Sequence, residues 1–263
     1  MPFTISHIVA AVPLRWLGLP LLPLAIGCMA PDFFYFIPRH LGGDISHTIP
    51  GMFLAALPAA YVTLVLFQYF LRTPLLLLLP VRHQALATAL TAGARPGSFW
   101  ARPWGTAVLL LTGIATHLAW DSFTHLRGTM VQKLPFLAET SIDTPLGSVE
   151  LYKLLQHGSS GTGLAALAAG YLWLFCRRQQ TPTPATIPAI VQLPTRIRRR
   201  VRLTICAITA SAFAGEFHWQ WGYDGKHDRI WEAVTAGGMA LLAASIVYCL
   251  LWHWQSQGAR RGG

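Results

Sequence analysis

Charged residues are scarce in this sequence. Asp, Glu, Lys and Arg make up 11% of its 263 residues, and 53% of the residues are hydrophobic, whereas a soluble domain usually carries about 25% charged residues. The apolar stretches are continuous runs without the alternation that transmembrane strands require, which disfavours a barrel. The composition therefore predicts an all-α, polytopic bundle of membrane helices, with residues 1–263 forming a single membrane domain.

Cysteine is also scarce, and the four residues of this type form no CxxC pair. Cys28, Cys176, Cys206 and Cys249 lie mostly in apolar segments, so we expect reduced, buried side chains and neither a disulfide framework nor a cysteine-based zinc site. The N-terminus lacks a charged region followed by an apolar core and a cleavage site. We therefore expect no cleaved signal peptide.

Long apolar runs predict about five membrane spans. They are Met52–Leu71, Trp104–His125, Gly163–Phe175 (extended back to about Ser159), Val201–Phe217 and Ile230–Trp252. The run Trp16–Ala30 is shorter than the roughly 20 residues that a span needs, and it predicts a buried or half-inserted N-terminal helix. Leu75–Leu79, between two prolines, is too short to cross and is expected at the membrane interface.

Acidic residues are missing from the segments that hold most of the basic ones. Those segments are the loop 72–103, the linker 177–202 and the tail with Arg260 and Arg261. The positive-inside rule assigns them to the cytoplasm and assigns residues 1–51 and the end of the run 104–125 to the opposite side of a bacterial inner membrane. Arg196–Arg202 precedes a hydrophobic run directly, so we expect it to contact anionic lipid and not nucleic acid.

The end of the second predicted span carries three ionisable residues in a row of i, i+4 and i+8. His117, Asp121 and His125 would share one face of a helix. Ionisable groups are costly near hydrocarbon, so such a row indicates a functional site.

Further candidates lie on the same predicted side. Residues 1–51 form an N-terminal metal-site segment with His7, Asp32 and His47, and His157 follows later in the chain. Imidazole and carboxylate groups suit zinc and other divalent first-row metals, and Asp121 can bridge two ions. Each residue also has a plainer interpretation: a single His is often interfacial, and Asp32 suits a helix cap. His40 is a substitute candidate for one ligand.

Ser159 and Ser160 follow Gly158 without a G-x-S-x-G pattern. A nucleophile at this position is disfavoured, and a helix N-cap is the better interpretation.

Several of these motifs together resemble a known bacterial membrane family, the domain of unknown function 4184. The motifs cover nearly the whole chain. They are residues 2–7 (PFTISH), 27–36 (GCMAPDFFYF), 46–51 (SHTIPG), 116–125 (THLAWDSFTH) and 155–160 (LQHGSS). The family has no established activity, so the resemblance adds no mechanism.

The order of His and Asp residues is also similar to that of membrane-bound metal-dependent hydrolases and of zinc-dependent phospholipases C. This resemblance implies one metal on Asp32, His47, His117 and Asp121. It implies a second metal on His7 beside Asp121, and a third on His125 with His157. The third would need a Glu near position 161, where this chain has Gly161. We therefore expect one or two divalent ions, with zinc as the first candidate.

Three hypotheses for function follow. The first is a membrane-bound metal-dependent hydrolase, phospholipase C-like, acting on a phosphoester or related bond of a lipid or lipid-linked substrate. In it Asp32 and Asp121 are the catalytic proton acceptors. The second is a structural or transport protein that binds metal without hydrolysis. The third is polar packing without metal.

Overall fold

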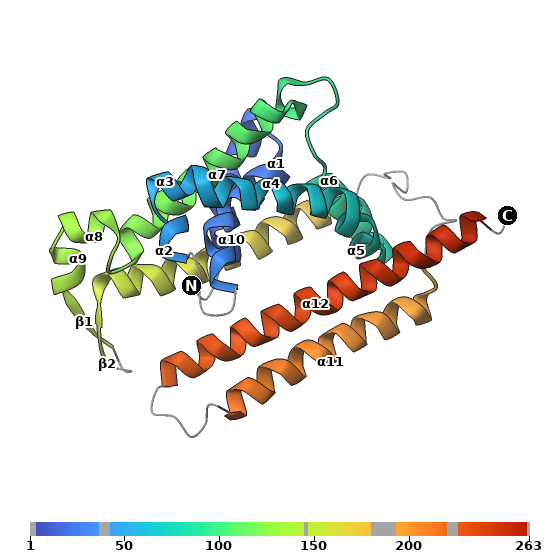
Figure 1. Cartoon of the computed structure of the whole chain (residues 1–263). Coiled ribbons are helices and arrows are strands. Elements are labelled where there is room, and N and C mark those ends of the chain that lie inside the picture. Colours follow the sequence, from blue (N-terminus) through green and yellow to red (C-terminus); the bar gives the residue numbers. More distant parts are fainter. Residues whose placement is uncertain (1–3, 37–42, 145–146, 180–192, 220–225, 262–263) are drawn as a thin grey trace. The chain divides into compact units, whose positions relative to one another are not determined.

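A computed structural model describes residues 4–36, 43–144, 147–179, 193–219 and 226–261 (Figure 1). In this part of the chain the fold is all-α apart from one short hairpin, as the composition predicts. The chain divides into two compact units. The site unit comprises Phe3–Leu64 and Ala92–Gln179, and the C-terminal unit comprises Val65–Thr91 and Gln180–Gly263 with Met1–Pro2. A single domain formed by both units stays a prediction.

The site unit begins with short helical segments and continues with two long helices. Its first part contains the 3-10 helices η1 (Thr4–Ala11), η2 (Pro13–Leu17) and η3 (Ala30–Phe36), and the α-helices α1 (Leu21–Met29), α2 (Gly43–Ser46) and α3 (Ile49–Gly51). Its second part contains η7 (Phe99–Ala101), α7 (Pro103–Thr124), α8 (Thr129–Lys133), α9 (Phe136–Glu139) and α10 (Leu151–Gln179). Between α9 and α10, β1 (Ser141–Thr144) pairs antiparallel with β2 (Gly147–Glu150).

Helix α1 crosses α7 at very short distance because both helices carry glycine at the crossing. A Cβ atom on Gly27 would lie 2.3 Å from the carbonyl oxygen of Leu110, and one on Gly113 would lie 2.3 Å from that of Leu24. Most of α1 is buried, which confirms the predicted buried N-terminal helix within Leu21–Met29. The crossing brings the end of α1, and η3 after it, against the C-terminal half of α7.

Helix α7 changes character along its buried face. Leu110 and Ile114 are fully buried apolar residues, and His117, Asp121 and Thr124 continue the same stripe with polar side chains. The helix ends at Thr124, because His125 has an extended backbone conformation. A packing surface thus becomes a polar cluster within the last two turns.

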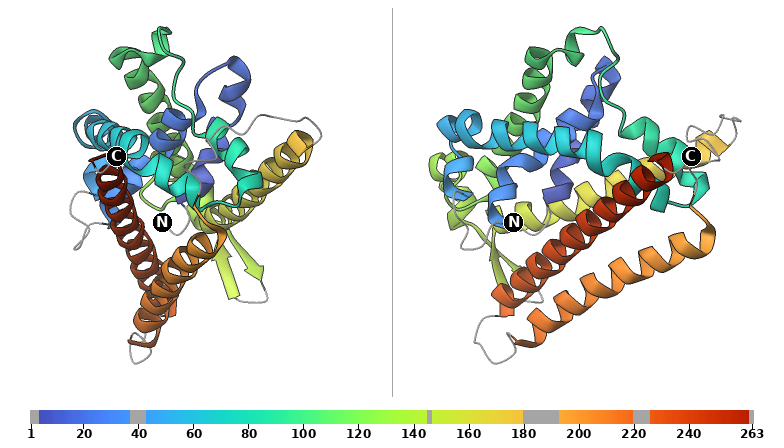
Figure 2. Two further views of the ribbon diagram at one scale, coloured as in Figure 1. Left: turned by 90° about the vertical axis from the view of Figure 1, so that its right-hand side faces the viewer. Right: turned by 45° about the vertical axis from the view of Figure 1, so that its right-hand side comes forward.

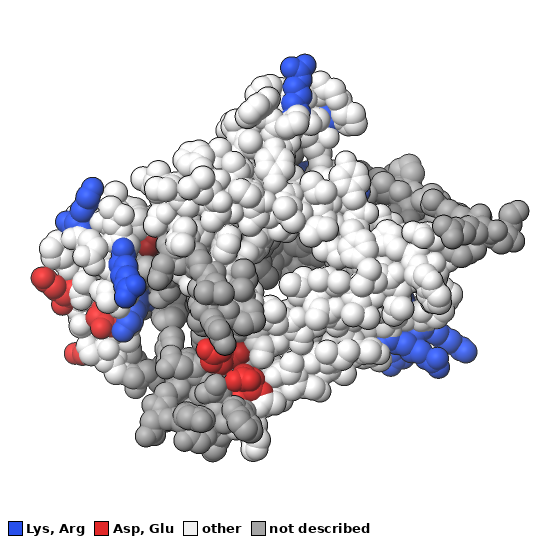
Figure 3. All heavy atoms as spheres, in the orientation of Figure 1, with Lys and Arg blue, Asp and Glu red and all other residues white. Residues whose placement is uncertain are grey.

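The C-terminal unit contains a long helical pair. Helices α11 (Thr195–Trp219) and α12 (Lys226–Arg261) run side by side along most of their length (Figures 1 and 2). The unit also holds α6 (Val81–Leu90). Arginine side chains gather at the first turns of α11, where Arg196, Arg199 and Arg200 are exposed (Figure 3).

A continuous helical run, Ile49–Leu78, contains two π-helical turns. After α3 it consists of η5 (Met52–Ala56, π), α4 (Leu57–Leu66), η6 (Phe67–Leu71, π) and α5 (Arg72–Leu78). The segment Leu75–Leu79 is thus not separate from the first predicted span, since the same helical run continues to Leu78; its place at the membrane interface stays a prediction. Pro74 lacks the N–H that would bond the carbonyl of Phe70, and His253 Nε2 donates to that oxygen instead, at 2.9 Å.

Three helices of the described chain are long and apolar enough to cross a membrane: Ile49–Leu78, Leu151–Arg178 and Glu232–Gln257. They include three of the five predicted spans. The other two predicted spans form helices α7 and α11, which are not among the three. His117 and Asp121 make α7 more polar, and a run of arginines opens α11. Side chains of the three long helices are mostly not buried inside the protein, as a lipid-facing helix requires.

The four cysteines are free, as predicted, but only Cys28 and Cys249 are buried. Cys176 and Cys206 are exposed on α10 and α11, on helices whose outward faces carry apolar side chains. The expectation of four buried cysteines is therefore wrong for these two.

Candidate metal centre

Six of the seven predicted metal ligands lie together in the site unit. His7 comes from η1, Asp32 from η3 and His47 from the turn after α2, while His117 and Asp121 come from α7. His125 follows directly after α7. The α1–α7 crossing brings the N-terminal segment to the polar end of α7, so residues about 70 to 110 positions apart in sequence meet.

Four of these side chains converge on one point. Asp32, His47, His117 and Asp121 each offer an atom, and the four atoms lie within 4.8 Å of one another. His117 Nε2 is 3.1 Å from Asp121 Oδ2, 3.3 Å from His47 Nε2 and 3.5 Å from Asp32 Oδ1. His47 Nε2 is 3.3 Å from Asp32 Oδ1 and 3.5 Å from Asp121 Oδ2.

Five of the six separations in this group match those around a tetrahedral ion, and the sixth, between the oxygens of Asp32 and Asp121, is no longer than 4.8 Å. Zinc bonds of about 2.0–2.2 Å place the ligand atoms roughly 3.3–3.6 Å from one another. Three of the four residues are buried, and His47 is partly buried. The group can therefore hold a divalent metal ion with little rearrangement.

Hydrogen bonds on the outer side fix the tautomers of the two imidazoles. His117 Nδ1 is 2.7 Å from the carbonyl oxygen of Cys28, which only accepts, so Nδ1 carries the proton and Nε2 a lone pair. Ser46 Oγ donates to the carbonyl oxygen of Pro31 and lies 3.2 Å from His47 Nδ1. It therefore accepts from His47 Nδ1, and His47 Nε2 also carries a lone pair.

The two Nε2 atoms thus face each other at 3.3 Å with a lone pair on each, an arrangement that offers no hydrogen bond between neutral rings. A cation between them would satisfy both. Hydrogen-bond partners such as the carbonyl of Cys28 and the hydroxyl of Ser46 are typical of metal sites, where they orient the imidazole ring and set its tautomer.

Most oxygens of the two carboxylates, Asp32 and Asp121, lack hydrogen-bond donors among the described residues. Asp32 Oδ1 and both oxygens of Asp121 are buried and receive no hydrogen bond of good geometry among the described residues. Asp32 Oδ2 does accept a hydrogen bond of 2.7 Å from Thr4 Oγ1. Buried carboxylate oxygens without donors are costly, and a metal ion would remove that cost.

His7 and His125 lie on the other oxygen of Asp121. His7 Nε2 is 3.6 Å and His125 Nδ1 is 3.4 Å from Asp121 Oδ1. His125 also contacts Thr124 Oγ1 through Nδ1 and the side-chain amide of Gln156 through Nε2. Asp121 therefore has two histidines on each of its oxygens, as a bridging carboxylate requires.

Burial lowers the pKa of His7 to about 4, and the charge that His117 carries when protonated adds to this effect. The His7 ring is therefore neutral at pH 7, and one of its two nitrogens carries a lone pair. The pKa of Asp32 is also lowered: burial opposes ionisation, and His47 and His117 in their protonated forms, with the hydrogen bond from Thr4, outweigh it. Both groups are in the protonation state that metal binding needs.

His157 is not part of the four-residue group, and its side chain is exposed on α10. His40 lies outside the described residues. We expected Ser159 to cap the start of a helix. It lies inside α10 instead, where it accepts a hydrogen bond of 3.1 Å from Trp120 Nε1. The capping interpretation failed because α10 begins at Leu151, two turns earlier.

Thr4, Ser46 and Gln156 were missed by the sequence reasoning. Each contacts a candidate ligand from behind. Thr4 and Ser46 lie within the motifs 2–7 and 46–51, next to predicted ligands, which was the available signal. Gln156 immediately precedes His157 within the motif 155–160, which was the available signal for it.

The chain belongs to the family of the domain of unknown function DUF4184, whose family model matches residues 1–250. No curated protein and no solved structure is detectably similar to it. The family membership therefore extends over nearly the whole chain without supplying an activity.

Proposed function

We propose that this protein is a divalent-metal-dependent hydrolase that acts on a phosphoester or related bond of a lipid or lipid-linked substrate. The observation that carries the proposal is the meeting of two imidazole nitrogens and two carboxylate oxygens within 4.8 Å, with five of the six ligand–ligand distances between 3.1 and 3.5 Å. Zinc is the first candidate, because tetrahedral nitrogen and oxygen sites suit it.

The two oxygens of Asp121 divide the cluster into two ion positions. One ion would lie among Asp32, His47, His117 and Asp121 Oδ2, which offer four protein atoms. A second would lie between Asp121 Oδ1, His7 and His125 Nδ1. There the side-chain amide of Gln156 would turn over and accept from His125 Nε2, so that Nδ1 carries the lone pair. That position has three protein ligands, so it keeps a place open for water or substrate, as catalytic sites do.

The chemistry follows from this asymmetry. A divalent ion at the open position would lower the pKa of a water to about 7 and polarise a phosphoryl oxygen. An oxygen of Asp32 or Asp121 that is not bound to an ion is the proposed acceptor of the water proton. Hydrolysis adds water across the P–O bond: the oxygen of water joins phosphorus, and the leaving alcohol takes up a proton.

A lipid substrate fits the surroundings of the cluster. Helix α10, which supplies Gln156 behind His125, is one of the three helices able to cross a membrane, and its first turns lie at the cluster. A headgroup could then reach the ions while its chains remain in the bilayer. The similarity of the His and Asp order to that of zinc-dependent phospholipases C supports the same substrate class.

The test is turnover by detergent-purified protein loaded with zinc or manganese, on a panel of phospholipids and lipid phosphates. We expect release of phosphate or a phosphorylated headgroup from at least one lipid, lost in Asp121→Asn. Asp143→Asn, an exposed carboxylate in the hairpin, is the matched control and should match the wild type. Fully loaded protein that cleaves no lipid in the panel would contradict the hydrolase proposal.

A second function, a metal that only stabilises the fold, is favoured by one observation. The group of Asp32, His47, His117 and Asp121 offers four protein atoms to one ion, and structural zinc sites are closed by four protein ligands. This alternative predicts one ion per chain and no effect of His7→Ala on metal content, whereas the hydrolase proposal predicts a second, weaker ion that His7→Ala removes.

A further inference from the structure

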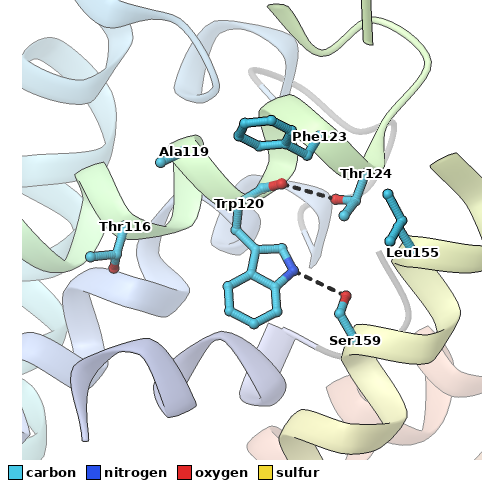
Figure 4. A pocket seen from close by; sticks show the side chains of 7 residues that line it. All are labelled: Thr116, Ala119, Trp120, Phe123, Thr124, Leu155 and Ser159. Atoms are coloured by element: carbon cyan, nitrogen blue, oxygen red, sulfur yellow. Dashed lines mark hydrogen bonds between the residues drawn. The ribbon is translucent and has the colours of Figure 1, made fainter. Parts of the chain in front are cut away.

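A pocket lies between α7 and α10, directly beside the candidate metal centre. Its volume is about 560 Å³, within the usual range for ligand sites. Seven side chains line it (Figure 4): Thr116, Ala119, Trp120, Phe123 and Thr124 from α7, and Leu155 and Ser159 from α10. The metal ligands His117 and Asp121 lie on the same helix, between these residues in sequence.

The polar groups in the lining are already hydrogen-bonded within the protein. Trp120 Nε1 donates to Ser159 Oγ (Figure 4). Ser159 Oγ itself donates to the carbonyl of Gln156. Thr116 donates to the carbonyl of Gly113, and Thr124 to that of Trp120. With these donors used, the lining presents mainly hydrocarbon to an occupant, so the occupant should be apolar.

Two lining residues connect the pocket to the open side of the cluster. The Trp120 ring meets the His7 ring edge to face, with centroids 5.9 Å apart. Thr124 Oγ1 lies 3.1 Å from His125 Nδ1. His7 and His125 are the two histidines on Asp121 Oδ1, so the pocket adjoins the ion position that keeps a place for substrate.

The mouth of the pocket has the character of a lipid-facing surface. Phe123 is 42% exposed and Leu155 is 39% exposed. Leu155 and Ser159 lie in the first turns of a candidate membrane span that begins at Leu151. At the end of such a span headgroups give way to chains, so one molecule can reach the cluster and the pocket together.

We propose that this pocket binds the first part of the hydrocarbon chain of the substrate, while the phosphoester lies at the metal ions. The inference rests on the proposed function and specifies its substrate class: an amphiphile whose chain begins within a few bonds of the phosphate. Burial of each methylene contributes about 0.8 kcal/mol. Affinity should therefore rise roughly threefold to fourfold with each methylene until the pocket is full.

The probes are methyl, butyl, hexyl and octyl phosphate, added to full-length protein loaded with cobalt(II) in detergent. Binding is followed by the change in the cobalt absorption spectrum, which requires no turnover. In wild type we expect methyl phosphate to bind weakly and affinity to climb with chain length. Ala119→Trp fills the pocket from α7, so this variant should bind methyl phosphate as the wild type does, with the dependence on chain length flattened.

Two further variants make the result specific. Leu155→Trp fills the pocket from α10 and should also flatten the dependence of affinity on chain length. It replaces Ala119→Trp if that variant does not fold. Val108→Trp adds the same side chain to an exposed position of α7 outside the lining, so it should retain the wild-type slope and controls for partition into detergent.

The outcomes separate the two proposals. Binding of all the phosphates with equal affinity, or equal slopes in wild type and both pocket variants, would overturn the chain pocket and leave the metal-dependent hydrolase intact. Binding of none of them to cobalt-loaded protein would contradict a phosphoester substrate, and the chain pocket with it.

Discussion

At the scale of single residues, the candidate site is defined by what lies behind its ligands. The carbonyl of Cys28 and the hydroxyl of Ser46 hold the proton of each imidazole away from the centre. Thr4 orients Asp32 from behind by donating a hydrogen bond to Asp32 Oδ2. The ligands themselves could be predicted because ionisable residues stand out in an apolar chain. Their partners could not, since backbone carbonyls and hydroxyl groups occur everywhere in a sequence.

Replacing Thr4 by valine should weaken metal binding without removing a ligand. The change deletes the 2.7 Å hydrogen bond to Asp32 Oδ2, and loss of such a partner typically lowers metal affinity by about 10-fold to 100-fold. Competition with a chelator of known affinity measures the change. Thr162→Val removes only exposed hydrogen bonds to the carbonyls of Gly158 and Ser159 and should leave the affinity unchanged. Equal affinities for Thr4→Val and wild type would mean that Thr4 does not orient Asp32.

His157 gives a second prediction at this scale. Its side chain is exposed and outside the four-residue group, so His157→Ala should retain the wild-type number of metal ions. Gln156→Ala should instead weaken the second ion, because it removes the 2.7 Å contact to His125 Nε2. Metal content after dialysis distinguishes them, and loss of an ion in His157→Ala would restore His157 as a ligand.

At the scale of elements, α7 both packs the site unit and carries the site. The row His117, Asp121 and His125 predicted a shared helix face, and the structure gives that face to His117 and Asp121 while the helix ends before His125. Helical periodicity could not reveal the end, because it depends on the backbone of His125. The crossing of α1 over Gly113 was equally hidden, since a glycine in an apolar run does not say which backbone approaches it.

Gly113→Ala should destabilise the site unit and weaken metal binding together. The new methyl group would meet the carbonyl oxygen of Leu24 at 2.3 Å and the amide of Cys28 at 2.7 Å, so α1 must move, and with it the carbonyl that orients His117. Overpacking of this kind typically costs about 1–3 kcal/mol. Thermal unfolding in detergent, with metal content measured alongside, records both effects.

The matched control is Gly170→Ala on α10, where an added methyl group would meet nothing within 4 Å. Alanine is the better helix former by about 0.5–1 kcal/mol, so this variant should be as stable as the wild type or more stable. A Gly113→Ala protein with unchanged stability would show that the two helices can separate without cost.

At the scale of the whole molecule, composition predicted an all-α membrane protein, and three helices can cross a membrane. Five spans were expected because apolar runs were counted without regard to the polar ends of α7 and α11. The polar end of α7 carries His117 and Asp121 of the candidate site, and the polar end of α11 carries the arginine cluster. Composition therefore predicted the all-α fold, whereas the number of helices that span a membrane stays a prediction.

The predicted orientation can be tested with cysteine labelling in a variant that lacks the four native cysteines. Asp143→Cys in the β1–β2 hairpin should react with a membrane-impermeant thiol reagent added outside bacterial spheroplasts. Arg196→Cys at the start of α11 should react only after lysis, because basic segments remain in the cytoplasm. Reaction of both positions from the same side would contradict the predicted topology.

The most direct test of the central claim is metal content per chain, measured by mass spectrometry on detergent-purified protein after reconstitution with zinc, manganese or iron. The cluster predicts at least one equivalent in the wild type. His117→Ala should lose it while remaining folded, and Asp143→Ala should retain it. A folded wild-type protein that binds no metal under any of these conditions would contradict the account, and the cluster of Asp and His residues would then be polar packing.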